Sequence, residues 1–255
     1  MLKINLKLLA LQLFTPPPNN MKKLFFIILV LLFAESANAQ WFSKERILNR
    51  ENEDKKTLSW GYFLGFNSYD YNFDYISQNL GDETDIQVNG EVGFNVGLLG
   101  NLRISDHFDL RIEPGLSFTK RNLTFSDLDE PKDYLREVKA TYIHIPLLLK
   151  VSTKRLNNFK PFIVGGISTS INLASNEDHP EDNYTGQFRS TKNNINYELG
   201  FGIDFYLFYF KFTPSIRGVF GMNDELVYDN APNSPWTGNI AKMSSRGMFF
   251  NLTVQ

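Results

Sequence analysis

Apolar and polar residues alternate along most of the chain from residue 58 onward. In 91–103, for example, Val92 and Phe94 fall on one face, and Gly93 and Asn95 fall on the other. A period of two predicts β-strands that have one apolar face and one polar face. The alternating segments run for about 10 to 13 residues, whereas ordinary globular strands average about five or six and a tilted membrane-spanning strand needs about 9 to 11. The pattern therefore predicts strands that cross a membrane.

Eight alternating segments follow one another, and the connections between them are long and short in turn. An even number of strands with long loops on one side and tight turns on the other is typical of outer-membrane barrels. We therefore expect an all-β fold, an eight-stranded antiparallel transmembrane outer-membrane β-barrel with long extracellular loops, short periplasmic turns and both termini in the periplasm. The expected strands are 58–69, 91–103, 108–119, 138–151, 160–172, 194–205, 209–219 and 246–255.

A soluble β-sandwich or a lipocalin-like barrel would also alternate. A soluble barrel turns its charged face outward, but the polar faces here carry glycine, asparagine and serine with few lysines. The chain contains 23 Phe and 11 Tyr, and the strand ends are rich in them, as in 205–210 and 248–250. Aromatic side chains suit the level of the lipid headgroups. These features favour the membrane barrel.

The N-terminal part predicts an export signal. Residues 21–39 combine Lys22 and Lys23 with an apolar stretch and small residues, which is the pattern of a secretory signal peptide with cleavage between Ala39 and Gln40. The apolar stretch is too short for a membrane-spanning helix, which needs about 20 residues. The mature protein is therefore expected to be exported.

Two further segments complete the expected organisation. Residues 1–20 precede Met21 and are expected to be an upstream start extension, Met21 being the initiator. Residues 40–57 are too polar for a strand, and they are expected to form a periplasmic N-terminal segment. Such a segment could dock a periplasmic partner or serve as a flexible tether. The barrel then occupies 58–255.

Composition excludes several functional classes. The formal net charge is −2 and the chain contains no Cys. A strongly basic nucleic-acid binder, a disulfide framework and a thiolate metal site are therefore excluded. We expect no nucleic-acid partner and no cofactor.

Charged residues on the polar faces predict the contents of the lumen. Eight strands enclose a space that side chains can just fill, and charges in such an interior are costly unless they are paired. We therefore expect a packed polar lumen, with a gated ion path as the alternative. The expected salt-bridge network consists of Arg103, Arg111, Glu113, Glu198, Asp204, Lys211 and Arg217.

The long connections, 70–90, 120–137, 173–193 and 220–245, are acidic. An acidic outer rim could bind divalent cations or a basic patch on a partner, or it could simply keep the loops solvated. The spacing at 177–183 lacks the ligand order of a calcium loop, so no metal site is predicted. The rim comprises Asp82, Glu83, Asp85, Asp127, Asp129, Glu130, Glu177, Asp178, Glu181, Asp182, Asp224 and Glu225.

Catalysis has little support in the sequence. A hydrolase needs a nucleophile, a base and an orienting group within reach of one another. The three histidines fall on different parts of the expected barrel: His107 in a periplasmic turn, His179 at a loop tip and His144 on the lumen face of a strand. We therefore expect no catalytic constellation and no enzyme, with His144 as a lone hydrogen-bonded filler.

Three segments resemble the PorT family, called SprT in gliding species. They are DHFDLRIEPGLSFTKRNLTF at 106–125, INYELGFGIDFYLFYFKFTPSIRG at 195–218 and the terminal MFFNLTVQ at 248–255. The hairpin at 136–173, with its IPLLLK and KPF residues, follows a pattern that many small Bacteroidota barrels share. The resemblance extends over essentially the whole mature chain.

This resemblance implies a function. Members of the PorT family are outer-membrane barrels of the type IX secretion system, which exports proteins bearing a C-terminal sorting domain and, in gliding bacteria, surface adhesins. The implied partners are other components of that system, together with outer-membrane lipid and lipopolysaccharide. The family has no catalytic motif to transfer. The alternative is a general structural or adhesion barrel that stabilises the outer membrane.

Overall fold

The computed structural model describes residues 48–76, 86–125, 135–177, 188–231, 234 and 236–255. The expected start extension, the signal peptide and the cleavage site between Ala39 and Gln40 lie outside the described residues, as does the first part of the N-terminal segment. In the part of the chain that is described, none of the helical structure is long and apolar enough to cross a membrane.

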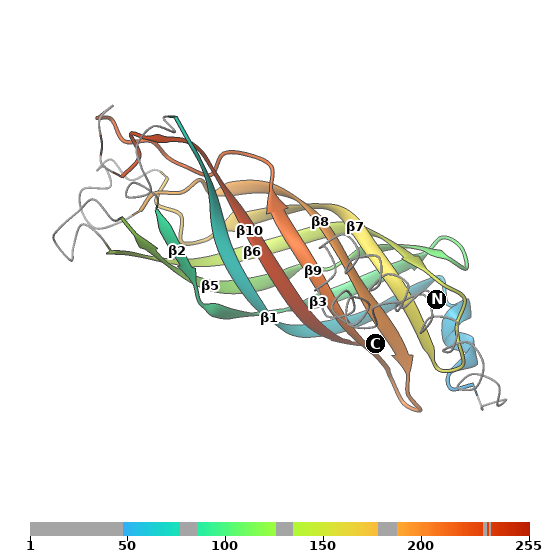
Figure 1. Cartoon of the computed structure of the whole chain (residues 1–255). Helices are drawn as coiled ribbons and strands as arrows, with labels where there is room; N and C mark the ends of the chain where they lie inside the picture. Colours follow the sequence, from blue (N-terminus) through green and yellow to red (C-terminus); the bar gives the residue numbers. More distant parts are fainter. Residues whose placement is uncertain (1–47, 77–85, 126–134, 178–187, 232–233, 235) are drawn as a thin grey trace, which may run out of the picture. The chain divides into compact units, whose positions relative to one another are not determined.

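The described part of the chain consists of one short 3-10 helix and ten β-strands, which wind side by side into a tilted barrel (Figure 1). The elements in chain order are η1 (Glu51–Lys55), β1 (Leu58–Tyr75), β2 (Gln87–Gly90), β3 (Val92–Arg103), β4 (Phe108–Ile112), β5 (Gly115–Thr124), β6 (Leu135–Ser152), β7 (Phe159–Asn172), β8 (Asn193–Tyr206), β9 (Lys211–Gly221) and β10 (Ile240–Val254).

The sheet closes on itself because β1 pairs with β10 on one side and with β3 on the other. All pairings are antiparallel among the described strands. β2 and β3 both pair with β5, so together they form one strand of the barrel. β4 and β5 both pair with β3 and with β6, so they also form one strand of the barrel. The prediction of an eight-stranded antiparallel barrel is therefore confirmed.

The two ends of the barrel differ in their connections. The turns 104–107, 153–158 and 207–210 lie at one end, which we call the short-turn end. The longer connections lie at the opposite end, which we call the long-loop end. Gln255 and the described start of the chain are both at the short-turn end, where Arg50 contacts Gln255.

The expected strand 108–119 is interrupted between β4 and β5 at Glu113 and Pro114. Pro114 lacks the N–H that a ladder needs, and so does Pro146 of β6 on the neighbouring strand. The register is unchanged across the interruption, because Ile112 pairs with Leu147 and Gly115 pairs with His144. The two prolines therefore remove hydrogen bonds without displacing the strand.

The central part of the barrel has an apolar outside and a polar inside. On β3, Val92, Phe94 and Leu98 are 77%, 50% and 65% exposed, whereas Asn95 is 1% exposed. The expected assignment of the two faces of this strand is therefore confirmed. An apolar outer wall of this kind is suited to contact with lipid.

Toward the long-loop end the pattern reverses. On β1 the inward positions become aromatic at Tyr69, Tyr71 and Phe73, while the outward positions become polar. Inward apolar side chains from several strands and loops form a buried cluster of Tyr71, Leu123, Phe125, Val138, Phe188, Leu226, Trp236, Ile240 and Met243. Beyond the apolar outer band, the strands thus continue as a barrel whose interior is apolar and whose outside is polar.

This reversal corrects the expected boundaries. β1 continues to Tyr75 and β6 begins at Leu135, so parts of the expected loops 70–90 and 120–137 are strand. The expected strands ended where the outward residues ceased to be apolar. The alternation continues beyond that point, with apolar residues inward and polar residues outward.

Candidate functional site

A chain of ion pairs crosses the centre of the lumen. Arg217 of β9 donates from Nη1 to Glu113 Oε2 at 2.7 Å, and its Nε lies 2.7 Å from Oε2 of Glu198 on β8. Arg111 of β4 reaches the other oxygen of Glu113 at 3.4 Å. All four side chains are nearly fully buried. The structure thus brings four of the seven proposed network residues together, and their ion pairs link three strands of the barrel to one another.

His144 of β6 joins the same network. Its Nε2 lies 2.7 Å from Oε1 of Glu198, and its Nδ1 lies 2.8 Å from Oγ of Ser170. The expectation that His144 is a hydrogen-bonded filler on the lumen face is therefore confirmed, but the side chain does not stand alone, because Ser170 and Glu198 lie beside it. Sequence reasoning could not place Ser170 and Glu198 beside it, because they come from β7 and β8 and their proximity depends on the register.

Serine, histidine and glutamate are also the residue types of a hydrolase triad. Here Ser170, His144 and Glu198 are at most 4% exposed, and Glu198 is already paired with Arg217. A triad must present its nucleophile to a substrate, and these side chains are enclosed within the lumen. The arrangement is therefore suited to filling and cross-linking the interior.

A second buried group lies closer to the short-turn end. Lys150 of β6 is paired with Oδ2 of Asp204 on β8 at 2.5 Å, and Thr213 donates to Oδ1 of Asp204 at 2.7 Å. Lys211 is also buried and lines a polar cavity of about 30 Å³ together with Lys150 and Asp204. Lys150 was not among the expected residues, although it lies an even number of positions from inward His144 and could have been found from the alternation.

Arg103 does not belong to the network. It pairs with Asp106 in the turn after β3, and its side chain is 29% exposed. The expectation for Arg103 is therefore wrong, because the strand ends at this residue and the neighbouring turn supplies a nearer carboxylate.

Another arginine, missed by sequence reasoning, lies fully buried above the central network. Arg121 is held over the rings of Tyr69, Tyr71 and Tyr142, and donates to Tyr142 Oη at 3.0 Å and to Ser245 Oγ at 3.2 Å. Cation–π contacts of this kind stabilise a desolvated guanidinium. The tyrosines therefore accommodate a charge that would otherwise be costly to bury.

Two residues of the expected acidic rim, Asp224 and Glu225, accept hydrogen bonds from other parts of the protein. Glu225 is fully buried and accepts hydrogen bonds from the backbone N–H and the hydroxyl of Ser245, at 2.8 and 2.7 Å. Asp224 accepts from the backbone N–H groups of Leu226 and Met243. For Glu225 the expectation of a solvated outer position is wrong, because the β9–β10 connection folds back over the barrel interior.

Most of the remaining rim lies outside the described residues. Glu177 is exposed and accepts a hydrogen bond from the backbone N–H of Lys192 at 2.7 Å. Within the described part of the chain, no group of three or more acidic or histidine side chains is arranged to hold a metal ion. The rim residues outside the described part of the chain are Asp82, Glu83, Asp85, Asp127, Asp129, Glu130, Asp178, Glu181 and Asp182.

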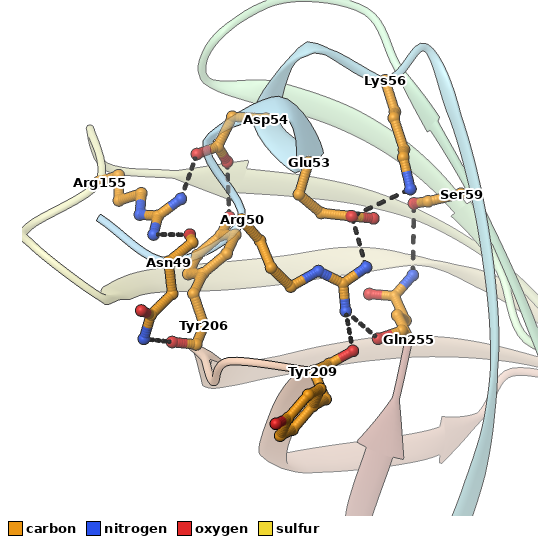
Figure 2. Close-up of polar contacts among 10 residues, drawn as sticks. All are labelled: Asn49, Arg50, Glu53, Asp54, Lys56, Ser59, Arg155, Tyr206, Tyr209 and Gln255. Carbon is orange, nitrogen blue, oxygen red and sulfur yellow. Dashed lines mark hydrogen bonds and ion pairs between the residues drawn. The ribbon is translucent and has the colours of Figure 1, made fainter. Parts of the chain in front are cut away.

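The described part of the N-terminal segment, 48–57, folds onto the short-turn end of the barrel. Figure 2 shows Arg50 donating from Nη1 to two backbone oxygens, that of Tyr209 in the β8–β9 turn at 3.0 Å and that of the C-terminal Gln255 at 3.1 Å. Asn49 donates to the backbone oxygen of Tyr206 at 3.0 Å. These contacts fix the segment to the β8–β9 turn and to the end of β10.

Asp54, within the short helix η1, makes a second set of contacts with the barrel. Its carboxylate accepts a hydrogen bond from Tyr206 Oη at 2.6 Å and pairs with Arg155 at 3.0 Å, and the Arg155 guanidinium stacks over the Tyr206 ring at 3.8 Å (Figure 2). Residues 48–57 are thus an ordered part of the barrel's end. The sequence showed only their polarity, which a tether would share.

Glu53 forms ion pairs with both Arg50 and Lys56. Burial disfavours its charged form, but hydrogen bonds from Lys56 and Arg50, together with their positive charges, outweigh this effect and hold the pKa of Glu53 below its usual value. The Glu53 Oε2 atom lies 2.5 Å from Arg50 Nη2 and 3.0 Å from Lys56 Nζ. This carboxylate therefore helps to keep Arg50 in position for its contacts with the barrel.

The β8–β9 turn presents an aromatic tip. Leu207 N–H donates to the oxygen of Phe210 at 3.0 Å, which closes the turn, and Phe208 and Tyr209 are 78% and 92% exposed. Figure 2 shows that Tyr209 meets Arg50 through its backbone, while its ring points away from the polar contacts. An exposed aromatic pair on a fixed turn is suited to the lipid headgroup level, as expected from the sequence, and also to contact with another protein.

A family model described as the outer membrane protein beta-barrel domain matches residues 38–227. Several solved structures are similar at low identity. Neisserial surface protein A is 10% identical with a TM-score of 0.42, over 78% of this chain and 99% of that one. OprG from Pseudomonas aeruginosa is 13% identical with a TM-score of 0.39, over 77% and 92%. Ail, the attachment invasion locus protein of Yersinia pestis, is 11% identical with a TM-score of 0.34, over 78% and 98%. No curated protein matches the chain significantly.

Proposed function

Because the chain belongs to the outer membrane protein β-barrel domain family, and is thus an integral outer-membrane protein, we propose that it serves protein secretion through the type IX secretion system as a member of the PorT (SprT) family. Its cargo would be proteins with a C-terminal sorting domain, including adhesins in gliding species. Its partners would be other components of that system. It would act by protein contacts and not as an enzyme or a pore.

The filled lumen supports the part of this proposal that excludes a pore. The ion pairs around Arg217 and Glu198 occupy the centre, the apolar cluster around Leu123 and Met243 fills the long-loop end, and residues 48–57 cover the short-turn end. A barrel packed at three levels has no room for a protein to pass. A role in secretion therefore requires that the barrel act through its outer surfaces.

The barrel is proposed to have its short-turn end in the periplasm, with both termini of the mature chain on that side, as is usual for outer-membrane barrels. Two of the segments that resemble the PorT family meet at this end. Lys211 of the segment 195–218 and Gln255 of the segment 248–255 exchange two backbone hydrogen bonds, at 2.8 and 2.9 Å. Arg50 contacts both Tyr209 and Gln255. We place the surface that contacts other secretion components here, around the aromatic tip.

Deletion of the gene tests the secretion role. Loss of extracellular sorting-domain cargo from cells with an intact outer membrane would support it. Normal cargo export from cells that have become sensitive to detergent would contradict it and would favour the general structural barrel.

Variants of the aromatic tip test the proposed surface. In the double variant F208S/Y209S, cargo export should fall while the barrel still assembles, because the exposed rings contact little of the barrel itself. Leu156, 42% exposed in the β6–β7 turn, provides a matched control, and L156S should export normally. Equal export by both variants and the unaltered protein would show that the tip is not the contact surface.

A further inference from the structure

A groove of about 350 Å³ runs along the outside of the barrel over β3, β5 and β6. The rings of Phe94 and Phe118 stack at 4.6 Å between centroids and form one apolar wall. Thr141 of β6 lines the groove, and Lys120 and Lys139 lie along it. The lining is thus apolar with two ammonium groups.

The groove lies where the outer wall changes from apolar to charged. On β5 the outward residues are Leu116 and Phe118, followed by Lys120. On β6 the outward residues are apolar from Val151 back to Ile143, and Thr141 and Lys139 follow. A switch of this kind marks the boundary between the hydrocarbon region and the headgroups. The groove is therefore continuous with the lipid-facing wall and opens at the level of the headgroups.

Carboxylates hold the two lysines at this level. Lys120 Nζ lies 2.9 Å from Glu91 and 3.2 Å from Glu137, and Lys139 Nζ lies 2.8 Å from Glu137. Lys139 is 73% exposed. An ammonium has three donors, and among the described residues a carboxylate takes only one of those of Lys139. The remaining donors are therefore accessible from outside the barrel and can bind phosphate oxygens.

We propose that this groove is a binding site for a phosphorylated lipid of the outer leaflet, namely lipopolysaccharide. One acyl chain of its lipid A would lie against Phe94 and Phe118, and a phosphate would be bound by Lys139 and Lys120. The assignment to the outer leaflet rests on the proposed orientation, because the groove lies toward the long-loop end. The proposal is independent of any role in secretion.

Native mass spectrometry of the purified mature protein in detergent tests the site, with purified lipid A, chemically dephosphorylated lipid A and phosphatidylglycerol as probes. One molecule of lipid A should bind per barrel, at least tenfold more tightly than either of the other two lipids. T141W fills the groove and should weaken binding of lipid A at least tenfold. T169W places the same side chain outward on β7 and should leave binding unchanged.

The charge requirement has its own pair of variants. K139Q should remove most of the preference for lipid A over its dephosphorylated form, whereas K242Q, which alters an outward lysine on β10, should retain it. Assembly of each variant is checked by the shift in electrophoretic mobility on heating.

Three results would overturn the proposal. Equal binding by T141W and T169W would show that the groove is not the site. Equal binding of lipid A and its dephosphorylated form would remove the phosphate contact. Equal binding of phosphatidylglycerol and lipid A would exclude lipopolysaccharide as the specific occupant. Secretion is not a readout in this experiment, so none of these results bears on the secretion role.

Discussion

Arg217 Nη1 donates to Glu113 Oε2 at 2.7 Å and so joins β9 to the end of β4 across the lumen. The same guanidinium pairs with Glu198, and Glu113 also pairs with Arg111. Removing one member of such a network leaves the others desolvated and incompletely paired. The network is therefore expected to contribute to the stability of the assembled barrel.

The variant E113Q tests this contribution. It should lower the free energy of unfolding by about 3 kcal/mol, because two buried arginines lose a carboxylate. Unfolding by urea in phospholipid vesicles, followed by tryptophan fluorescence, measures the change. R246Q is the matched control, since Arg246 pairs with Asp70 on the exposed surface and should cost less than about 1 kcal/mol. Similar losses in both variants would contradict a special role for the lumenal network.

A charge on the lipid-facing wall should impair assembly according to its depth. Ile216 lies midway along the outward row of β9, and I216R should cost about 2 to 4 kcal/mol in the free energy of unfolding in vesicles. Thr124 is outward at the long-loop end of β5, beyond Lys120, and T124R should cost at most about 1 kcal/mol. Equal costs at both positions would show that the assignment of the membrane boundary is wrong.

Loss of the Arg50 side chain should loosen the cover of the short-turn end without unfolding the barrel. Charge-assisted hydrogen bonds contribute about 1.5 to 3 kcal/mol each when buried, and partial exposure reduces this, so R50A should raise local opening roughly tenfold. Hydrogen exchange of the amides of 49–56, measured by mass spectrometry, reports this opening. K56A removes the more exposed partner of Glu53 and should have a much smaller effect. Unchanged exchange in R50A would mean that other contacts hold the segment.

The pKa of Glu53 predicts how this cover responds to pH. The folded state holds that pKa below its usual value of 4.5, so the stabilisation is fully present above pH 4.5 and is lost as the pH falls through the lower, folded value. Hydrogen exchange of 49–56, corrected for the intrinsic effect of pH, should therefore accelerate as the pH is lowered below about 4.5. E53Q should exchange faster at neutral pH and lose this dependence. A dependence that persists in E53Q would contradict its assignment to Glu53.

The alternation of the sequence was sufficient to predict the barrel because lipid imposes one rule on every outward residue. Val92 and Phe94 had to face outward once Asn95 was assigned inward, and the structure agrees. The same alternation also contained the extension of β1, since Tyr69, Tyr71 and Phe73 continue the inward positions. The extension of β1 could therefore have been predicted by following the inward and outward positions beyond the point where the outward residues cease to be apolar.

Other features depend on distances that the alternation does not fix. Glu225 belongs to an acidic connection, and only the return of that connection over the barrel interior brings it to Ser245. The segment 48–57 is polar whether it is free or docked. Its docking depends on the backbone oxygens of Tyr206, Tyr209 and Gln255, and a backbone oxygen is present at every position whatever the residue type. Such contacts follow from the shape of the closed barrel.

The most direct test of the account is the electrical conductance of the mature protein in planar lipid bilayers, because the proposal of a barrel that acts by contact requires a filled lumen. The ion pairs at Arg217, the apolar cluster at the long-loop end and the cover held by Arg50 predict a bilayer without stable conducting steps. Large, long-lived steps that scale with the amount of inserted protein would show an open pore and would contradict the account.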